Sequence, residues 1–178
     1  MSWHSVPHRY GSVAIAIHWL SAAAILALFA LGFLAANTAD SAVQAALLRV
    51  HVPLGLLALL LTVLRIVWWL AFDRRPVPLP GMPGWQAGAE RAVRVLLYAL
   101  ILVMGASGIT TVALSGAAAV LFFGAPGPLP DFWRVPPMNA HFIGALALLA
   151  LAGLHIVAAL HHHFWRRDGL LDRMWLPN

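Results

Sequence analysis

The sequence predicts an all-α integral membrane protein, a single bundle of four transmembrane helices. Of its 178 residues, 62% are hydrophobic and 10% are charged, whereas a soluble domain carries about 25% charged residues. Three long stretches, 10–39, 95–130 and 135–165, contain no Asp, Glu, Lys or Arg. Because about 20 apolar residues cross the hydrocarbon core of a bilayer, each stretch is long enough to span it. These observations exclude a soluble enzyme.

The first two spans are bounded by polar and helix-breaking residues. The first covers about 13–36 and ends near Asn37. Its apolar run is too long for a signal peptide and no small-residue cleavage site follows, so we expect it to remain as a membrane helix. The second span covers about 48–72 and stops at Asp73-Arg74-Arg75-Pro76, where charges and a proline interrupt the apolar pattern.

The last two spans each follow a segment rich in proline and glycine. The third covers about 89–114 and follows segment 76–84, while the fourth covers about 139–165 and follows segment 123–137. Both segments are predicted to be irregular connections, because proline and glycine interrupt helices. The sequence contains no internal repeat, so residues 1–178 are predicted to form one domain.

The arginines predict an orientation. All eleven basic residues are arginines, and with six acidic residues they give a net charge of +5. Most of them flank one side of the predicted membrane, whereas the other side has only Arg49 and Arg134, accompanied by Asp40 and Asp131. The positive-inside rule then places both termini in the cytoplasm. An excess of basic over acidic residues in a membrane protein is typical of cytoplasmic loops and of contacts with lipid headgroups. We therefore expect no nucleic-acid partner.

The chain has no cysteine. This excludes disulfides, thiolate metal sites, iron–sulfur clusters and covalently attached c-type haem. Any redox cofactor would therefore be held by histidine, methionine or carboxylate side chains.

Four histidines, His18, His51, His141 and His155, fall within or at the ends of the spans. An ionisable side chain at membrane depth is costly and indicates a functional site, although any one of them alone would also suit a hydrogen bond between helices. His141 and His155 lie fourteen residues apart on the fourth span, within about 40° of one helix face and about 21 Å apart along the axis. This separation suits two haems stacked across the bilayer.

Topology supplies the second ligand of each haem. His51 begins the second span at the periplasmic level of His141, and His18 lies near the cytoplasmic end of the first span, closest in level to His155. We therefore predict two haem b groups, one between His51 and His141 and one between His18 and His155. Iron with two axial imidazoles has no open position, which suits electron transfer.

Arg65 and Gly55 are predicted to contact the haems. Arg65 follows His51 by fourteen residues, and the six acidic residues of the chain lie in loops or at the ends of helices, so none is placed to neutralise it within the membrane. A haem propionate would do so through bidentate pairing, and the alternative is that the side chain snorkels to the interface. Gly55 follows His51 by four residues and, without a Cβ, would leave room for a macrocycle.

The sequence resembles the bacterial cytochrome b561 family, small four-helix proteins of the inner membrane with two b haems. The resemblance extends over nearly the whole chain and rests on these fragments, in order: Ala16-Ile17-His18-Trp19-Leu20, Arg49-Val50-His51-Val52-Pro53-Leu54-Gly55, Leu64-Arg65-Ile66-Val67-Trp68-Trp69, Val95-Leu96-Leu97-Tyr98, Met104-Gly105-Ala106-Ser107-Gly108, Asn139-Ala140-His141 and the block from Leu154-His155 to Arg173-Met174. It implies haem ligation at the four histidines above. Several relatives carry histidine where this chain has Arg91 and Arg94, and arginine does not ligate iron.

The resemblance also implies electron transfer to or from quinones. Some members resemble superoxide oxidases, which pass electrons from periplasmic superoxide through both haems to ubiquinone, and this is the predicted function. One alternative is a cytochrome subunit that links a dehydrogenase, hydrogenase or periplasmic protein partner to the quinone pool. An alternative from another class is a histidine-lined metal transporter, against which the lack of membrane carboxylates and thiols argues.

Three residues are candidates for the quinone site. His162 follows His155 by seven residues, which places it on the same helix face about 10 Å nearer the cytoplasm. There it would hydrogen-bond a quinone carbonyl and handle its proton. The alternative is that His161, His162 and His163 form a solvated cluster. His163, also within the family motif, and Arg94 are the other quinone candidates.

Two arginines are candidates for guiding an anionic donor. Arg49 and Arg134 bracket the periplasmic histidine pair in sequence, and positive charge at the mouth of a site would steer an anion such as superoxide. The alternative is that both are ordinary loop arginines.

Overall fold

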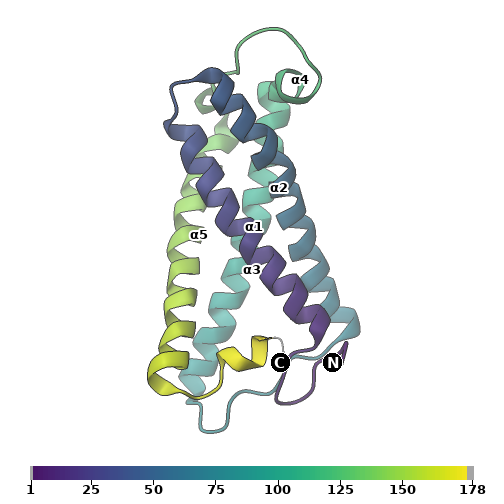
Figure 1. Ribbon diagram of the computed structural model, residues 1–178, viewed down its shortest axis with the longest axis vertical. Helices are drawn as coiled ribbons and strands as arrows, with labels where there is room; N and C mark the ends of the chain where they lie inside the picture. The colour runs from purple at the N-terminus through teal and green to yellow at the C-terminus, as the bar shows by residue number, and fades with distance from the viewer. Residues whose placement is uncertain (1, 176–178) are drawn as a thin grey trace.

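The computed structural model describes residues 2–175 and confirms the four-helix prediction (Figure 1). Within these residues, four helical segments are long and apolar enough to cross a membrane. They are α1 (Ser12–Asn37), α2 (Ser41–Val67) with a π-helical turn Trp68–Phe72, α3 (Gly84–Ser115), and α5 (Pro136–Leu160) with a π-helical turn His161–Arg166. Shorter elements are α4 (Ala117–Phe122) and two 3₁₀ turns, Phe132–Arg134 and Leu171–Met174.

The two ends of the bundle differ in what they carry (Figure 1). The N-terminal segment and the turn Leu171–Met174 lie together at one of them, which we call the terminal end. The opposite end carries α4 and its loop, and we call it the α4 end. Which end faces the cytoplasm stays a prediction.

The helices extend beyond the predicted spans. The second helix begins at Ser41 rather than near residue 48, because the Asp40 carboxylate accepts hydrogen bonds from the N–H groups of Ala42 and Val43 at 2.8 and 3.1 Å and caps it. The third begins at Gly84 rather than near residue 89. Apolar patterning marks only the part of a helix inside the hydrocarbon, and these helices continue into the headgroup region.

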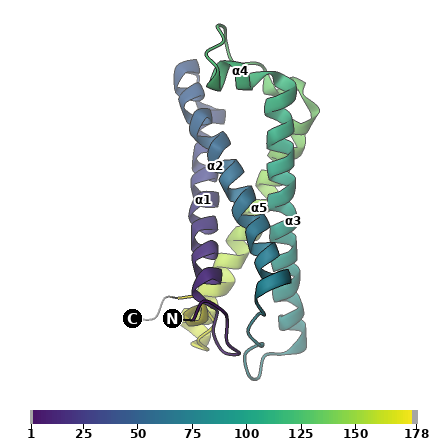
Figure 2. The same ribbon diagram turned by 90° about the vertical axis from the view of Figure 1, so that its right-hand side faces the viewer.

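The helices pack as two pairs (Figure 2), and the residues buried between them are mostly small. The closest partners are α1 with α2 and α3 with α5, and α2 also contacts α3. Most of the buried apolar residues are alanines, whereas large apolar side chains such as Phe33 and Leu70 are exposed, with fractions of 69% and 82%. This pattern is typical of membrane bundles, in which small residues allow close packing and large apolar residues face lipid.

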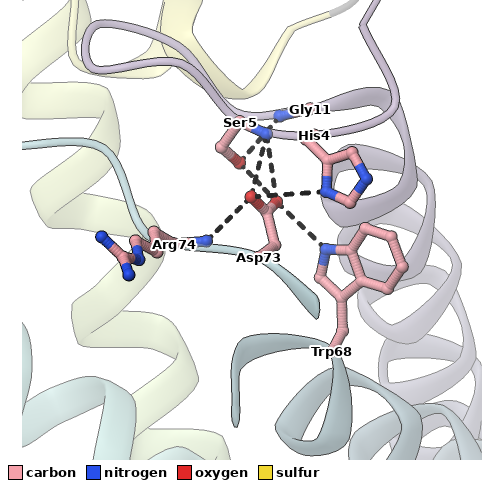
Figure 3. A network of polar contacts seen from close by, with 6 residues as sticks. All are labelled: His4, Ser5, Gly11, Trp68, Asp73 and Arg74. Atoms are coloured by element: carbon pink, nitrogen blue, oxygen red, sulfur yellow. Dashed lines mark hydrogen bonds and ion pairs between the residues drawn. The ribbon is translucent and has the colours of Figure 1, made fainter. Parts of the chain in front are cut away.

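A buried carboxylate ties the N-terminal segment to the end of α2 (Figure 3). The Asp73 side chain, only 3% exposed, accepts hydrogen bonds from the Ser5 N–H, the Ser5 hydroxyl, the Trp68 indole and the Arg74 N–H. The His4 ring stacks on Trp68 and its Nδ1 lies 4.0 Å from Asp73 Oδ1. Burial raises the pKa of Asp73, but the hydrogen bonds, led by that of the Ser5 hydroxyl, outweigh it and lower the pKa overall.

Replacing Asp73 by asparagine is expected to destabilise this end of the bundle at neutral pH. Hydrogen bonds to a charged acceptor contribute about 1.5–3 kcal/mol. Because the folded-state pKa of Asp73 is below its usual value of 3.8, the contribution is present above that value and is lost as the pH falls through the folded-state pKa. Thermal unfolding in detergent should therefore show a lower Tm for the variant at neutral pH, with a gap that closes in acid.

The matched control is Asp131→Asn, at a half-exposed carboxylate near the α4 end. We expect its Tm to stay close to that of the unchanged protein. A Tm gap for Asp73→Asn that persists unchanged into acid would contradict the role given to the charge.

Candidate functional site

Two pairs of histidine rings join α5 to the α1–α2 pair. The outer pair, toward the α4 end, is His51 and His141, with ring centres 6.2 Å apart and planes at 71°. The inner pair, toward the terminal end, is His18 and His155, with centres 6.4 Å apart and planes at 78°. An imidazole nitrogen binds a metal ion at about 2.0–2.1 Å, which puts the centres of two rings on opposite sides of one ion about 6 Å apart. Both pairs have the spacing that one metal ion between the rings requires.

The number of donors in each pair fits haem better than a bare metal ion. Within residues 2–175, no group of three or more His, Cys, Asp or Glu side chains is positioned to hold a metal. A structural or catalytic zinc ion requires three or four protein ligands. Haem iron takes four nitrogens from its macrocycle, so two axial histidines complete its coordination. Ligation by these four histidines stays a prediction.

Arg65 lies at the inner pair. Its Nη1 is 2.9 Å from Nδ1 of His18, and its guanidinium lies over the Tyr98 ring at 5.9 Å. The Arg65 Nε and the Tyr98 hydroxyl are both buried without a hydrogen-bond partner among the described residues. A buried cation beside unpaired hydrogen-bond donors is an environment in which a carboxylate would bind, and the propionate groups of haem are carboxylates. The propionate role of Arg65 stays a prediction.

Gly55 is not required by the packing of the protein. A Cβ at this position would lie 3.9 Å from Leu28 Cδ2, an ordinary van der Waals contact. Its predicted role in leaving room for a haem macrocycle therefore has no support from contacts within the chain, and it stays a prediction.

His162 is the centre of a polar cluster at the terminal end. The side chain of His162 is buried, and its Nδ1 lies 2.5 Å from Oδ2 of Asp168. Its Nε2 lies 2.7 Å from Nε2 of Gln86, whose Oε1 accepts a hydrogen bond from Arg166 at 3.1 Å. The contact with Arg166 fixes the Gln86 amide, so that its NH₂ group donates to His162. The Nδ1 hydrogen of His162 therefore points to Asp168.

The end of α5 explains why Asp168 meets His162. The last turn, His161–Arg166, is π-helical, and Arg167 adopts a left-handed conformation with φ of 50° that reverses the chain. Burial raises the pKa of Asp168, but the hydrogen bonds from His162 and the Leu170 N–H outweigh it and lower the pKa overall. A cleft beside the cluster is lined by segment 79–82 and by Gln86, His162, Arg166 and Asp168.

The other predicted quinone residues lie outside this cleft. Arg94 donates a hydrogen bond to Glu90 at 2.7 Å, and His163 lies 3.8 Å from Asp172. His162 therefore differs from Arg94 and His163 in two respects: its side chain is buried, and it contacts Gln86 and Asp168. The solvated cluster suggested as an alternative for all three adjacent histidines is wrong for His162, which is 7% exposed.

The two arginines near the α4 end have partners within the chain. Arg49 donates from Nε to the Leu121 carbonyl at 2.8 Å and so anchors α4. Arg134 is 85% exposed and lies 3.2 Å from Asp131, which offsets its charge. These contacts favour a structural role for both, with Arg49 inside α2 and Arg134 at the end of a 3₁₀ turn. Steering of an anion by either residue stays a prediction.

Several residues at these sites were not assigned a role from the sequence. Gln86 lies 76 positions before His162 in the sequence, and Asp168 lies six positions after His162. Both separations exceed the three or four positions between side chains that meet on one helix. Gly32 and Gly108 each lie against a histidine of another helix. The histidine-to-aspartate spacing past a helix end would have been a weak signal, and the glycine contacts required the tertiary structure.

Comparisons with known proteins agree with this geometry. The family model described as prokaryotic cytochrome b561 matches residues 9–177. The protein named cytochrome b561 homolog 2 from Escherichia coli is 32% identical, over 98% of this chain and 95% of its own length. The protein named cytochrome b562 from Cereibacter sphaeroides is 31% identical, over 94% of this chain and 96% of its own length. No solved structure gave a significant match.

Proposed function

Because the chain belongs to the prokaryotic cytochrome b561 family and is thus a membrane electron-transfer protein that binds haem b, we propose that it is a superoxide oxidase that reduces ubiquinone. The observation that supports electron transfer across the membrane is the presence of two histidine pairs, the outer pair toward one end of the bundle and the inner pair toward the other. The choice of superoxide as donor rests on the family resemblance. The bacterial inner membrane is the proposed location, with the terminal end in the cytoplasm.

The residues that would hold two haem b groups are the outer and inner histidine pairs. When bound between two imidazoles, haem b supplies one-electron redox chemistry without an open coordination position. Arg65 would pair with a propionate of the inner group, since it is a buried cation with an unpaired Nε. The short distance from Arg65 to His18 places that charge within the inner pair.

His162 would position the quinone and handle its protons in the cleft at the terminal end. Asp168 holds the hydrogen of Nδ1 and would stabilise the positive charge when Nε2 is also protonated. In the structure Nε2 accepts from the Gln86 NH₂ group, so this amide would have to turn away when the quinone binds. The protonated Nε2 would then donate to a quinone carbonyl, as general acids do. The surrounding wall, segment 79–82, is part of the connection between α2 and α3.

The proposed reaction balances in electrons and protons. Two superoxide ions are oxidised to two dioxygen molecules and lose one electron each. One ubiquinone takes up these two electrons and two protons to form ubiquinol. Superoxide would react at the α4 end, near the outer histidine pair.

A visible spectrum of the purified, oxidised protein during exposure to a superoxide source tests the proposal. We expect rapid growth of the reduced b-type α and Soret bands toward the dithionite endpoint, because the outer haem would accept electrons directly. Superoxide dismutase should abolish this growth, which provides the control for the donor.

Reduction by dithionite but not by superoxide would contradict the superoxide proposal while leaving a dihaem cytochrome. The protein would then be a subunit that accepts electrons from a dehydrogenase, hydrogenase or periplasmic partner. A protein with bound zinc or copper and no Soret band would contradict both and favour the metal transporter.

A further inference from the structure

The α3 helix holds the His141 ring in one protonation form. Nδ1 of His141 lies 3.1 Å from the main-chain oxygen of Met104, an atom that can only accept a hydrogen bond. Nδ1 therefore carries the ring hydrogen, and the lone pair is on Nε2. This is the form in which a histidine binds a metal through Nε2 while its other nitrogen donates to a carbonyl.

Ser107 reinforces this form. Its hydroxyl is buried, with the residue 8% exposed, and donates to the Met104 oxygen at 3.1 Å. Since that hydrogen is already directed to Met104, the Ser107 oxygen can only accept from Nδ1 of His141, which lies 3.2 Å away. Two acceptors thus face the same ring hydrogen.

Gly108 determines how closely the ring lies against α3. A Cβ at Gly108 would lie 3.1 Å from Cε1 and 3.4 Å from Nδ1 of His141, closer than ordinary van der Waals contact. Gly32 of α1 stands in the same relation to His51, with distances of 3.2 and 3.6 Å. Each ring of the outer pair therefore rests on a glycine of a neighbouring helix, and a methyl group at either position would require the ring to shift by a few tenths of an ångström.

The inner pair has a different environment. Nδ1 of His18 faces the Arg65 guanidinium, which can only donate. In this arrangement Nδ1 of His18 accepts, whereas Nδ1 of His141 donates. Ligation of iron through Nε2 of His18 would therefore require the Arg65 guanidinium to turn away from Nδ1, toward the propionate proposed as its partner. Substitutions in Met104–Gly108 should accordingly affect one pair and not the other.

We propose that Ser107 and Gly108 are positioning residues that fix the orientation and the ring hydrogen of His141, and so prepare the outer pair for haem. The inference rests on the proposed function, since it concerns the ligand role of His141. Ser107 acts on the basicity of the ring, because an acceptor at Nδ1 makes Nε2 a stronger ligand. Gly108 acts on the orientation of the ring plane.

The test compares Ser107→Ala, Gly108→Ala and the control Gly88→Ala by redox titration and by electron paramagnetic resonance of the oxidised protein. Gly88 is on the same helix and has no atom within 4 Å of an added Cβ. Ser107→Ala should raise the midpoint potential of one haem, because a less basic ligand favours ferrous iron. Gly108→Ala should shift one of two low-spin ferric signals, because these depend on the angle between the axial ring planes.

Haem retention provides a second measurement. Loss of an outer hydrogen-bond partner or of ligand orientation weakens metal binding about 10- to 100-fold, so one haem should dissociate faster in Ser107→Ala and Gly108→Ala, and neither in Gly88→Ala. A purely structural role would lower Tm without moving the potential or the signal of one haem.

Identical potentials, signals and haem retention in all three variants would overturn the inference while leaving the proposed function intact. If the His141→Ala variant keeps both haems, His141 is not a ligand. That result overturns the inference together with the assignment of the outer pair.

Discussion

Replacing His155 by alanine is expected to leave the protein with one haem instead of two. His155 supplies half of the inner pair, and its partner His18 alone would offer the iron a single axial ligand. On α5, the histidine of the outer pair lies fourteen residues from His155, and the two pairs share no ligand. A haem assay against protein concentration should therefore fall to half of its starting value.

The two pairs predict the pattern in further variants. His18→Ala should also remove one haem, and the double variant His18→Ala/His155→Ala should lose no more than either single one, because the residues act as a unit. A variant lacking His51 and His155 should lose both haems. The control is His8→Ala, at an exposed histidine outside the pairs. Retention of both haems in His155→Ala would show that the pairing is wrong.

Replacing His162 by alanine is expected to slow quinone reduction about 10²-fold or more, the usual contribution of a positioned general acid. The haems should still load and still be reduced, since His162 belongs to neither pair. The measurement is the decay of the reduced α band in dithionite-reduced protein after excess reductant is removed and a soluble ubiquinone analogue is added. This assay does not depend on the identity of the donor.

Asp168→Asn should give an intermediate rate. Its side chain would still contact Nδ1 of His162 but would not stabilise a protonated ring by charge. His161→Ala is the matched control, because His161 is adjacent in sequence but exposed and absent from the cleft lining. Decay in His162→Ala as fast as in the unchanged protein would show that the quinone is reduced elsewhere.

The environment of His162 is an example of a site that sequence spacing located only in part. Its position seven residues after His155 predicted its level in the membrane. Its partners come from the start of α3 and from beyond the end of α5. Helical periodicity describes neighbours within one helix and therefore contains no information on either of them.

Arg49 is a different case, in which the structure adds a contact within the fold to a charge whose predicted function, steering of an anion, stays a prediction. Its position beside His51 predicted steering of an anion. The structure directs its Nε to the Leu121 carbonyl at the end of α4, a six-residue helix with no periodic signal in the sequence. A helix of six residues makes fewer than two turns, too few for a periodic pattern to be recognised.

The sequence by itself determined the four spans and the levels of the four histidines, because hydropathy and helical rise act along one helix at a time. The tertiary structure alone decided which side chains surround each histidine. Met104, Ser107 and Gly108 set the ring of His141 from another helix, while Arg65 faces His18. Such contacts depend on how two helices are rotated toward each other, and in a membrane that rotation is set by the close fit of small residues rather than by an apolar stripe.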